Sequence, residues 1–143
     1  MTIRQLSIFL ENRAGRLAAV AKILGDAGQN IRGLSVADTQ DFGILRLIVD
    51  NVDAAAKVLR EHDVVCHINE VIAVEVANSP GGLAKVLAVL VNTKVNIEYM
   101  YAVAEPKTAN PVMIFRFSDP KTAEQALTQA GLHTYSEQDL LQG

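Results

Sequence analysis

Cysteine is almost absent from this sequence, since Cys66 is the only one among 143 residues. A single thiol cannot form a disulfide within the chain, and it cannot supply a cysteine cage for a metal. Its neighbour His67 would point to the opposite face of a strand, so the two side chains do not predict a shared metal site. We therefore expect no metal and no cofactor.

Runs of basic residues and long apolar runs are also missing. The chain has 13 Lys and Arg against 16 Asp and Glu, a net charge of −3, and its basic residues do not cluster. Binding to nucleic acid or to an anionic membrane surface needs clustered positive charge. No segment approaches the roughly 18–20 apolar residues of a membrane span, and none resembles a signal peptide. We expect a soluble, cytoplasmic protein without nucleic-acid or membrane partners.

Tryptophan is absent and aromatic residues make up only 5% of the chain, although 50% of the residues are hydrophobic. A core can therefore form, but it must consist mainly of Val, Ile, Leu and Ala. The length fits one ordinary domain or two very small ones, and a lone unit of about 70 residues would be only marginally stable. Two such units are expected to stabilise each other by burying a shared face.

A segment near the N-terminus recurs 66 positions later. Between residues 12–36 and 78–102, 8 of 25 aligned pairs are identical, which is well above chance for unrelated sequence. The identical pairs are not only apolar, because they include Asn12 with Asn78, Gly15 with Gly81, and Asn30 with Asn96. The chain therefore contains a duplicated domain.

Both halves predict the same order of secondary structure. Alternation and helical periodicity place the first set of elements at 3–10 (strand), 17–24 (helix), 31–37 and 43–50 (strands), 53–61 (helix) and 64–67 (strand). The second set falls at 71–76 (strand), 83–91 (helix), 97–104 and 112–117 (strands), 122–130 (helix) and 132–135 (strand). Asn12 is expected to cap the first helix and Gly28 to end it. The segment 137–143 shows no clear pattern.

The order βαββαβ, taken twice, is the ferredoxin-like arrangement. We predict an α+β fold of two ferredoxin-like units packed together, residues 1–68 and 69–143. Each unit should form an antiparallel sheet with its helices on one face. No linker rich in Pro, Gly or Ser separates the units, so the last strand of one should run almost directly into the first strand of the next.

In each half, a glycine-containing turn joins the first strand to the first helix. The first N–H groups of a helix have no partner within it, so such a turn can bind a carboxylate or phosphate. Asparagine amides both donate and accept hydrogen bonds, which suits a ligand that carries a carboxylate and an ammonium. The chain has no glycine-rich nucleotide motif. A free α-amino acid therefore fits better than a nucleotide. Each Asn and Gly could instead serve only the fold, as a helix cap or a turn residue.

The two segments N-x-x-G-x-L, followed by G-x-N-I in the first half and V-N-I in the second, resemble the signature of the ACT domain. This resemblance covers nearly the whole chain as two tandem units and leaves no catalytic domain. It implies a non-catalytic regulatory protein that binds a free amino acid between paired ACT units, forms a homodimer and acts on a partner enzyme of amino-acid metabolism. The ligand-binding residues that it implies are Asn12, Arg13, Ala14, Gly15, Arg16, Leu17, Asn30, Ile31, Asn78, Ser79, Pro80, Gly81, Gly82, Leu83, Asn96 and Ile97.

The sequence departs from the family pattern at several positions. Ala14 replaces a proline that Pro80 keeps. Serine-sensing members carry a histidine two residues before the loop asparagine, where this chain has Leu10 and Val76, so serine is a poor candidate for the ligand. Lys94 aligns with Gly28, and the exits of the two helices are therefore expected to differ.

Two other functions stay open at this point. The segment 34–39 also resembles regulatory subunits of acetolactate synthase, so the chain could act mainly by binding a partner enzyme. An enzyme built on a ferredoxin-like fold is the third class, but no nucleophile with a neighbouring base stands out, and no catalytic residue is predicted.

Overall fold

A computed structural model describes residues 1–11, 13–38, 42–103 and 109–141. The chain divides into two compact units, namely residues 4–69 (the first unit) and residues 1–3 with 70–143 (the second unit). No helix within the described residues is both long and apolar enough to cross a lipid bilayer.

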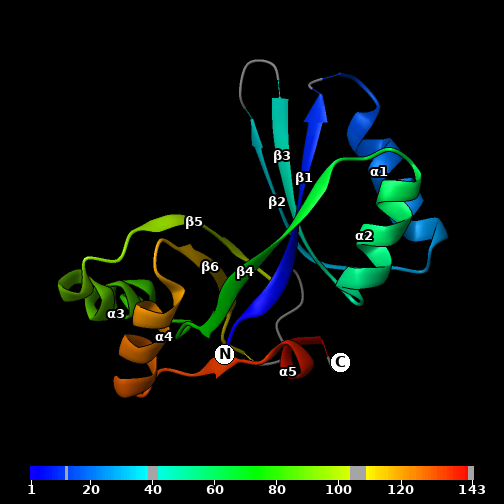
Figure 1. Cartoon of the computed structure of the whole chain (residues 1–143). Helices are drawn as coiled ribbons and strands as arrows, with labels where there is room; N and C mark the ends of the chain where they lie inside the picture. The colour runs from blue at the N-terminus through cyan, green and yellow to red at the C-terminus, as the bar shows by residue number, and fades with distance from the viewer. Residues whose placement is uncertain (12, 39–41, 104–108, 142–143) are drawn as a thin grey trace. The chain divides into compact units, whose positions relative to one another are not determined.

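The first unit has the predicted βαββαβ order. Its elements are β1 (Ile3–Glu11), α1 (Arg16–Asp26), β2 (Ile31–Asp38), β3 (Phe42–Val49), α2 (Val52–Glu61) and the start of β4 (Cys66–Glu75). The strand order is β2-β3-β1-β4, and β3 pairs antiparallel with both β1 and β2. Helices α1 and α2 lie side by side on one face of the sheet (Figure 1).

The second unit repeats this arrangement. After β4 come α3 (Gly82–Leu90), a short 3-10 helix η1 (Val91–Thr93), β5 (Ile97–Ala102), β6 (Val112–Phe117), α4 (Pro120–Gln129), β7 (Thr134–Tyr135) and α5 (Glu137–Leu141). The strand order β7-β4-β6-β5 is equivalent to that of the first unit, with the fourth and first strands of the unit followed by the third and second. The predicted ferredoxin-like α+β fold is confirmed.

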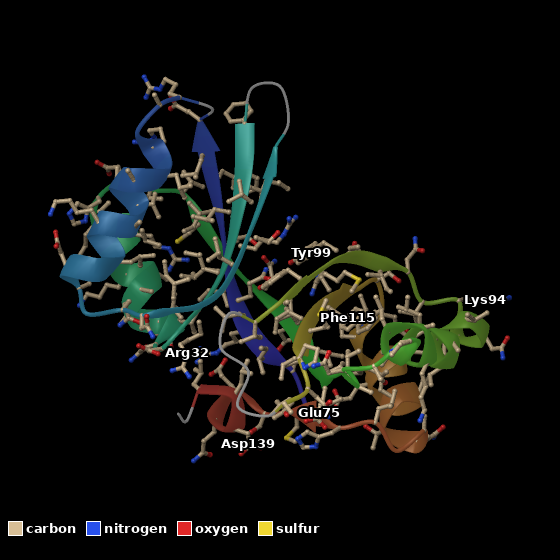
Figure 2. The ribbon with its side chains drawn as sticks, turned by 180° about the vertical axis from the view of Figure 1, so that it is seen from behind. Arg32, Glu75, Lys94, Tyr99, Phe115 and Asp139 are labelled. Atoms are coloured by element: carbon tan, nitrogen blue, oxygen red, sulfur yellow. The ribbon has the colours of Figure 1, made fainter. Side chains whose placement is uncertain are left out.

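Each unit has its own apolar core between the sheet and its two helices. The first core contains residues from α1, α2 and every strand of the unit, with Ile31 among the partly buried members. The second is built around Phe115 and Phe117, whose rings stack 5.4 Å apart and which pack with Val86, Leu90, Ala123 and Leu127 from α3 and α4. Phe115 is labelled in Figure 2. As expected without tryptophan, most of the buried residues in both cores are aliphatic.

The predicted strands at 64–67 and 71–76 are one strand. β4 runs without interruption from Cys66 to Glu75, and its two ends belong to the sheets of different units. Val64 lies in the turn that follows α2, where its N–H donates to the carbonyl of Leu59 at 2.9 Å. Polar residues interrupt the alternation at 67–70, but no Gly or Pro breaks the backbone there. This confirms the prediction that the last strand of the first unit continues directly into the first strand of the second.

The C-terminal segment, which was predicted to have no pattern, contains helix α5. The Ser136 hydroxyl accepts a hydrogen bond from the N–H of Asp139 at 3.0 Å and so caps the first turn. Leu140 anchors the helix with only 6% of its surface exposed. A five-residue helix is too short to produce a hydrophobic period, so only the capping serine could have indicated it.

The two helix exits differ, as expected, because α3 continues into the 3-10 helix η1 whereas α1 ends without one. Gly28 follows α1 with φ 75°, and Lys94 follows η1 with φ 61°, so both lie in the left-handed region. Lysine adopts this conformation at a steric cost that glycine does not have. Both exits therefore reach a residue in the left-handed region, which is a glycine in the first unit and a lysine in the second. Lys94 is labelled in Figure 2.

Replacing Lys94 with glycine should stabilise the second unit. The exposed lysine has no ion pair among the described residues, and relief of the left-handed strain should add about 1 kcal/mol to the free energy of unfolding. Urea denaturation followed by circular dichroism measures this change. Gly28→Ala is the reciprocal control and should lose a similar amount. A lower stability for Lys94→Gly would contradict the strain argument.

Candidate functional site

The turn that joins the first strand to the first helix has the same two backbone hydrogen bonds in both units. In the first, the N–H of Arg13 donates to the carbonyl of Glu11 at 2.8 Å, and the N–H of Arg16 donates to that of Arg13 at 3.3 Å. The second repeats these bonds 66 residues later, from Ser79 to Ala77 at 2.9 Å and from Gly82 to Ser79 at 3.0 Å. The duplicated sequence therefore encodes a duplicated turn.

Glycine caps the helix that follows each turn. Gly15 and Gly81 are the N-cap residues of α1 and α3, with φ of 86° and 85°, a conformation that other L-residues rarely adopt. The expectation that Asn12 caps the first helix is therefore wrong for the cap position, and Asn12 itself lies outside the described residues. A glycine has no side chain that could accept a bond from the first helical N–H groups.

Helices α2 and α4 are capped by the side chains of their N-cap residues. Asn51 accepts a hydrogen bond from the N–H of Ala54 at 3.1 Å, and Asp119 accepts one from the N–H of Thr122 at 3.2 Å. The hydroxyl and N–H of Thr122 lower the pKa of Asp119 below its ordinary value. Among the long helices of the described residues, α1 and α3 thus begin at glycine. The N–H groups of their first residues, Arg16 and Gly82, already donate within the turn, so an external anion would bind the N–H groups that follow.

The first turn carries positive charge. Arg13 forms an ion pair with Glu11 at 2.8 Å, and both side chains are more than half exposed, so this bond adds little stability. Arg16 is the first residue of α1 and is partly buried. Its Nε is buried and has no hydrogen-bond partner among the described residues. A buried donor without a partner is costly and would be satisfied by a ligand oxygen.

A small cavity opens beside this turn. Its volume is about 170 Å³, and it is lined by Leu10, Glu11, Arg13, Arg16, Leu17, Val36 and Gly43. The register brings these residues together, because Gly43 on β3 lies opposite Leu10 at the end of β1 and opposite Asp38 at the end of β2. The volume lies below the 300–1,000 Å³ of pockets for drug-sized ligands, so the site suits a small metabolite.

The second turn has different surroundings. The exposed Asn78 is bonded to the neighbouring hairpin, because its N–H donates to Asn110 Oδ1 at 3.0 Å and its side-chain amide donates to the carbonyl of Ala109 at 3.4 Å. The cavity next to this turn, about 200 Å³, includes Gly82, Lys85 and His133 in its lining. The two turns therefore share their backbone hydrogen bonds and a glycine N-cap but not a binding surface.

Asn30 and Asn96 lie away from the turns of their own units. Ile31 pairs with Val49, whereas the turn end of the sheet lies at Gly43, six residues or about 20 Å along β3. The N–H of Asn30 donates to Asp50 Oδ2 at 3.1 Å, and the N–H of Asn96 donates to Ser118 Oγ at 2.9 Å. Within one unit, the structure does not bring these asparagines to the turn.

The remaining predicted residues divide into two groups. Ala14, Leu17, Ser79, Pro80 and Leu83 are exposed at the two turns. Ile31 and Ile97 pack partly buried against the cores, so their side chains serve the fold. Sequence reasoning missed Leu10 and Val36 as lining residues. Strand alternation could have placed them on the helix side of the sheet, but only the register brings them to the same end.

Metal-binding groups do not converge anywhere in the part of the chain that is described. Cys66 is buried in the first core, whereas His67 is exposed and meets the ring of Phe9 edge-on at 5.7 Å. The two side chains therefore lie on opposite faces of β4, as strand alternation predicts.

Comparisons with known proteins agree with this geometry. A protein from Bacteroides thetaiotaomicron of known structure is 36% identical, with a TM-score of 0.91 over 100% of this chain and 98% of that one. The regulatory subunit of aspartate kinase from Thermus thermophilus, in its ligand-free form, is 19% identical, with a TM-score of 0.61 over 90% of both chains.

E. coli aspartokinase III, crystallised with lysine and aspartate, is 16% identical, with a TM-score of 0.53 over 90% of this chain and 30% of that one. These two kinase likenesses show the fold alone. A comparison with curated proteins finds no match. The pattern of the ACT domain pair matches residues 1–142. With the duplicated turn and the paired ferredoxin-like units, this match shows that the chain belongs to the ACT-domain family, as a pair of ACT domains.

Proposed function

We propose that this protein is a non-catalytic regulator that binds a free amino acid at the turn between the first strand and the first helix of its ACT units. The observation that carries the proposal is the first turn, where the glycine-capped start of α1, the buried Nε of Arg16 and a small cavity lie together. A carboxylate at this position would accept bonds from helical N–H groups and from arginine. ACT domains are regulatory modules, which agrees with a binding role.

Regulation would follow from linkage. A ligand that binds one arrangement of the protein more tightly shifts the population toward it, and a partner enzyme of amino-acid metabolism would respond to that arrangement. Within one ACT unit, the turn and the asparagine lie at opposite ends of the sheet. A site that uses both a turn and Asn30 or Asn96 therefore needs two ACT units facing each other. The two units of one chain could meet this requirement, as could the homodimer expected from the sequence, and we propose the homodimer, acting in the cytoplasm.

A thermal-shift screen against the twenty amino acids tests the proposal. A ligand at 100 times its Kd stabilises the folded state by about 2.7 kcal/mol, which should raise the Tm by several degrees. We expect one amino acid, or one group of similar side chains, to raise the Tm in a saturable way. No shift with any amino acid would contradict the proposal.

A second function, binding a partner enzyme as a dedicated subunit, is favoured by one observation. Phe9, Phe42 and Val65 of the first unit are 44%, 54% and 60% exposed. Phe9 and Phe42 alternate with the core-facing Leu10 and Gly43 positions, so they lie on the face of the sheet away from the helices. Exposed aromatic side chains are common at protein interfaces. Recovery of a stoichiometric enzyme in a pull-down, without any amino-acid effect, would support this function instead.

A further inference from the structure

We propose that two copies of this chain associate through the outer face of the first unit's sheet, with Phe9 and Phe42 at the centre of the contact. The inference assigns an interaction surface and its partner, a second copy of the chain. It does not depend on a bound ligand, so it and the proposed function can fail separately. Three observations carry it: an apolar row across the sheet, its absence from the second unit, and the lack of charge on it.

The strand register builds the apolar row on the face of the sheet that α1 and α2 leave uncovered (Figure 1). Phe9 of β1 lies opposite Ile44 of β3, and Ile44 lies opposite Ala37 of β2. Val65 adjoins the row, because its carbonyl accepts a hydrogen bond from the N–H of Phe9 at 3.2 Å. Phe42 lies two residues from Ile44 and therefore on the same face. We call these five residues the open face.

The open face is bounded on one side and exposed. The next row along the same strands is polar, since Ser7 lies opposite Arg46, and Arg46 lies opposite Ser35. The two phenylalanine side chains of the open face are 44% and 54% exposed. Together they leave roughly 200 Å² of apolar surface in water, because one phenylalanine side chain can bury about 150–250 Å². Contiguous exposed apolar residues with a polar rim mark interaction sites.

The second unit has a polar residue at the position of Phe9. Glu75 lies opposite Val112 in the second sheet, as Phe9 lies opposite Ile44 in the first, so Glu75 is the counterpart of Phe9. The Glu75 carboxylate accepts a hydrogen bond from the Tyr135 hydroxyl at 3.2 Å. This position is therefore satisfied within the second unit and does not need a partner molecule.

The counterpart of Phe42 is polar as well. Asn110 precedes Val112 by two residues, as Phe42 precedes Ile44. Its Oδ1 accepts a hydrogen bond from the N–H of Asn78 at 3.0 Å. Since the second copy of the fold forms with polar residues at both positions, the fold itself does not require aromatic residues there. The two phenylalanines therefore serve a contact outside their unit.

The composition of the open face favours a second copy of the chain over a different protein. Homodimer interfaces are more apolar than the average protein surface, whereas interfaces between proteins that also exist separately are not. Contacts between different proteins also use opposite charges to select and orient the partner. None of the five residues of the open face carries a charge. Two copies related by a twofold axis can therefore pack there without repulsion between like charges.

The edge of the sheet offers a different way to dimerise. β2 lies at the end of the strand order, and a second copy could pair with it edge to edge. However, the register between β2 and β3 shifts between Ile31 and Gly33. An irregularity of this kind interrupts the backbone pattern that an added strand would have to follow. We therefore place the contact on the open face, and a variant of β2 serves as a control.

Sedimentation velocity on the full chain, over a wide range of protein concentrations, tests the inference. We expect a reversible equilibrium between monomer and dimer, because the two phenylalanines supply only part of the roughly 800 Å² that a standard interface buries on each side. Phe9→Ser and Phe42→Ser should each weaken the dimer at least about tenfold. The matched controls are Val91→Ser in the second unit and Leu34→Ser on β2, at residues that are 74% and 49% exposed, and both should dimerise normally.

Amide chemical shifts recorded at high and low concentrations of the unmodified chain give a second measurement that does not depend on the folding of any variant. The changes between the two concentrations should centre on Phe9, Phe42, Ile44 and Val65. They should be small for the other residues of β2 and β3 and for the helices of the second unit.

Each other outcome overturns a defined statement. A chain that stays monomeric at every concentration would refute the inference, and the open face would then belong to a contact with a different protein, such as the partner enzyme considered above. A dimer that survives both phenylalanine variants but not Leu34→Ser would move the contact to the edge of β2. Neither result bears on amino-acid binding, which the thermal-shift screen tests independently.

Discussion

Gly82→Ala should destabilise the second unit by about 3 kcal/mol or more. A Cβ built at this position would lie 2.0 Å from the carbonyl oxygen of Ala77, well inside the contact distance, and this oxygen belongs to the backbone. The same oxygen accepts the bond from Ser79 that closes the turn, so it cannot move without disrupting the turn. Clashes of this kind inside a packed structure cost several kcal/mol. The free energy of unfolding in urea measures the loss.

Gly25→Ala is the matched control for this prediction. Gly25 lies within α1, and nothing approaches the position of its missing Cβ within 4 Å. Alanine there should stabilise the first unit by about 0.5–1 kcal/mol, because glycine loses more backbone entropy in a helix. A neutral Gly82→Ala would show that the turn can relax, and the steric account of the second turn would then be wrong.

Phe115→Ala should cost about 3–5 kcal/mol, the usual range for removing a buried phenylalanine ring. The side chain is fully buried, stacks on Phe117 and contacts the core between β6 and the helices of its unit (Figure 2). Its removal leaves a cavity that the surrounding side chains can fill only in part. Thermal and urea unfolding measure the effect.

The control for the core variant is Phe42→Ala, at a phenylalanine that is 54% exposed. This change should alter stability by less than about 0.5 kcal/mol. Similar losses for both variants would contradict the assignment of Phe115 to the core of the second unit.

The sequence predicted the fold well because the fold depends on local patterns. Alternating strands and helices with one apolar stripe can be recognised in a window of ten residues, and the 66-residue repeat supplied a second copy of each pattern. The incorrect secondary-structure predictions have local causes as well. β4 combines two predicted strands because the residues between them interrupt the apolar pattern without breaking the backbone, and α5 is too short to show a period.

The candidate site was predictable only in part. The repeated Asn and Gly residues indicated the turns, and Gly15 and Gly81 adopt the left-handed conformation that explains why both copies retain glycine. The asparagine pairs indicated a ligand more strongly than the structure supports, since Asn78 bonds to its hairpin and Asn30 lies at the other end of the sheet. The burial of Arg16 Nε and the convergence of Leu10 with Val36 depend on tertiary packing, which no sequence period reveals.

The most direct test of this account is amide chemical-shift mapping on the full chain during titration with the amino acid that gives the largest thermal shift. We predict that the largest changes occur at the N–H groups of residues 13–18, where the turn meets α1, with smaller changes at Leu10 and Val36. Residues 79–84 of the second turn should change little. Changes confined to the second turn, or to the groove between α1 and α2 that Ile23, Val58 and His62 line, would contradict the central claim.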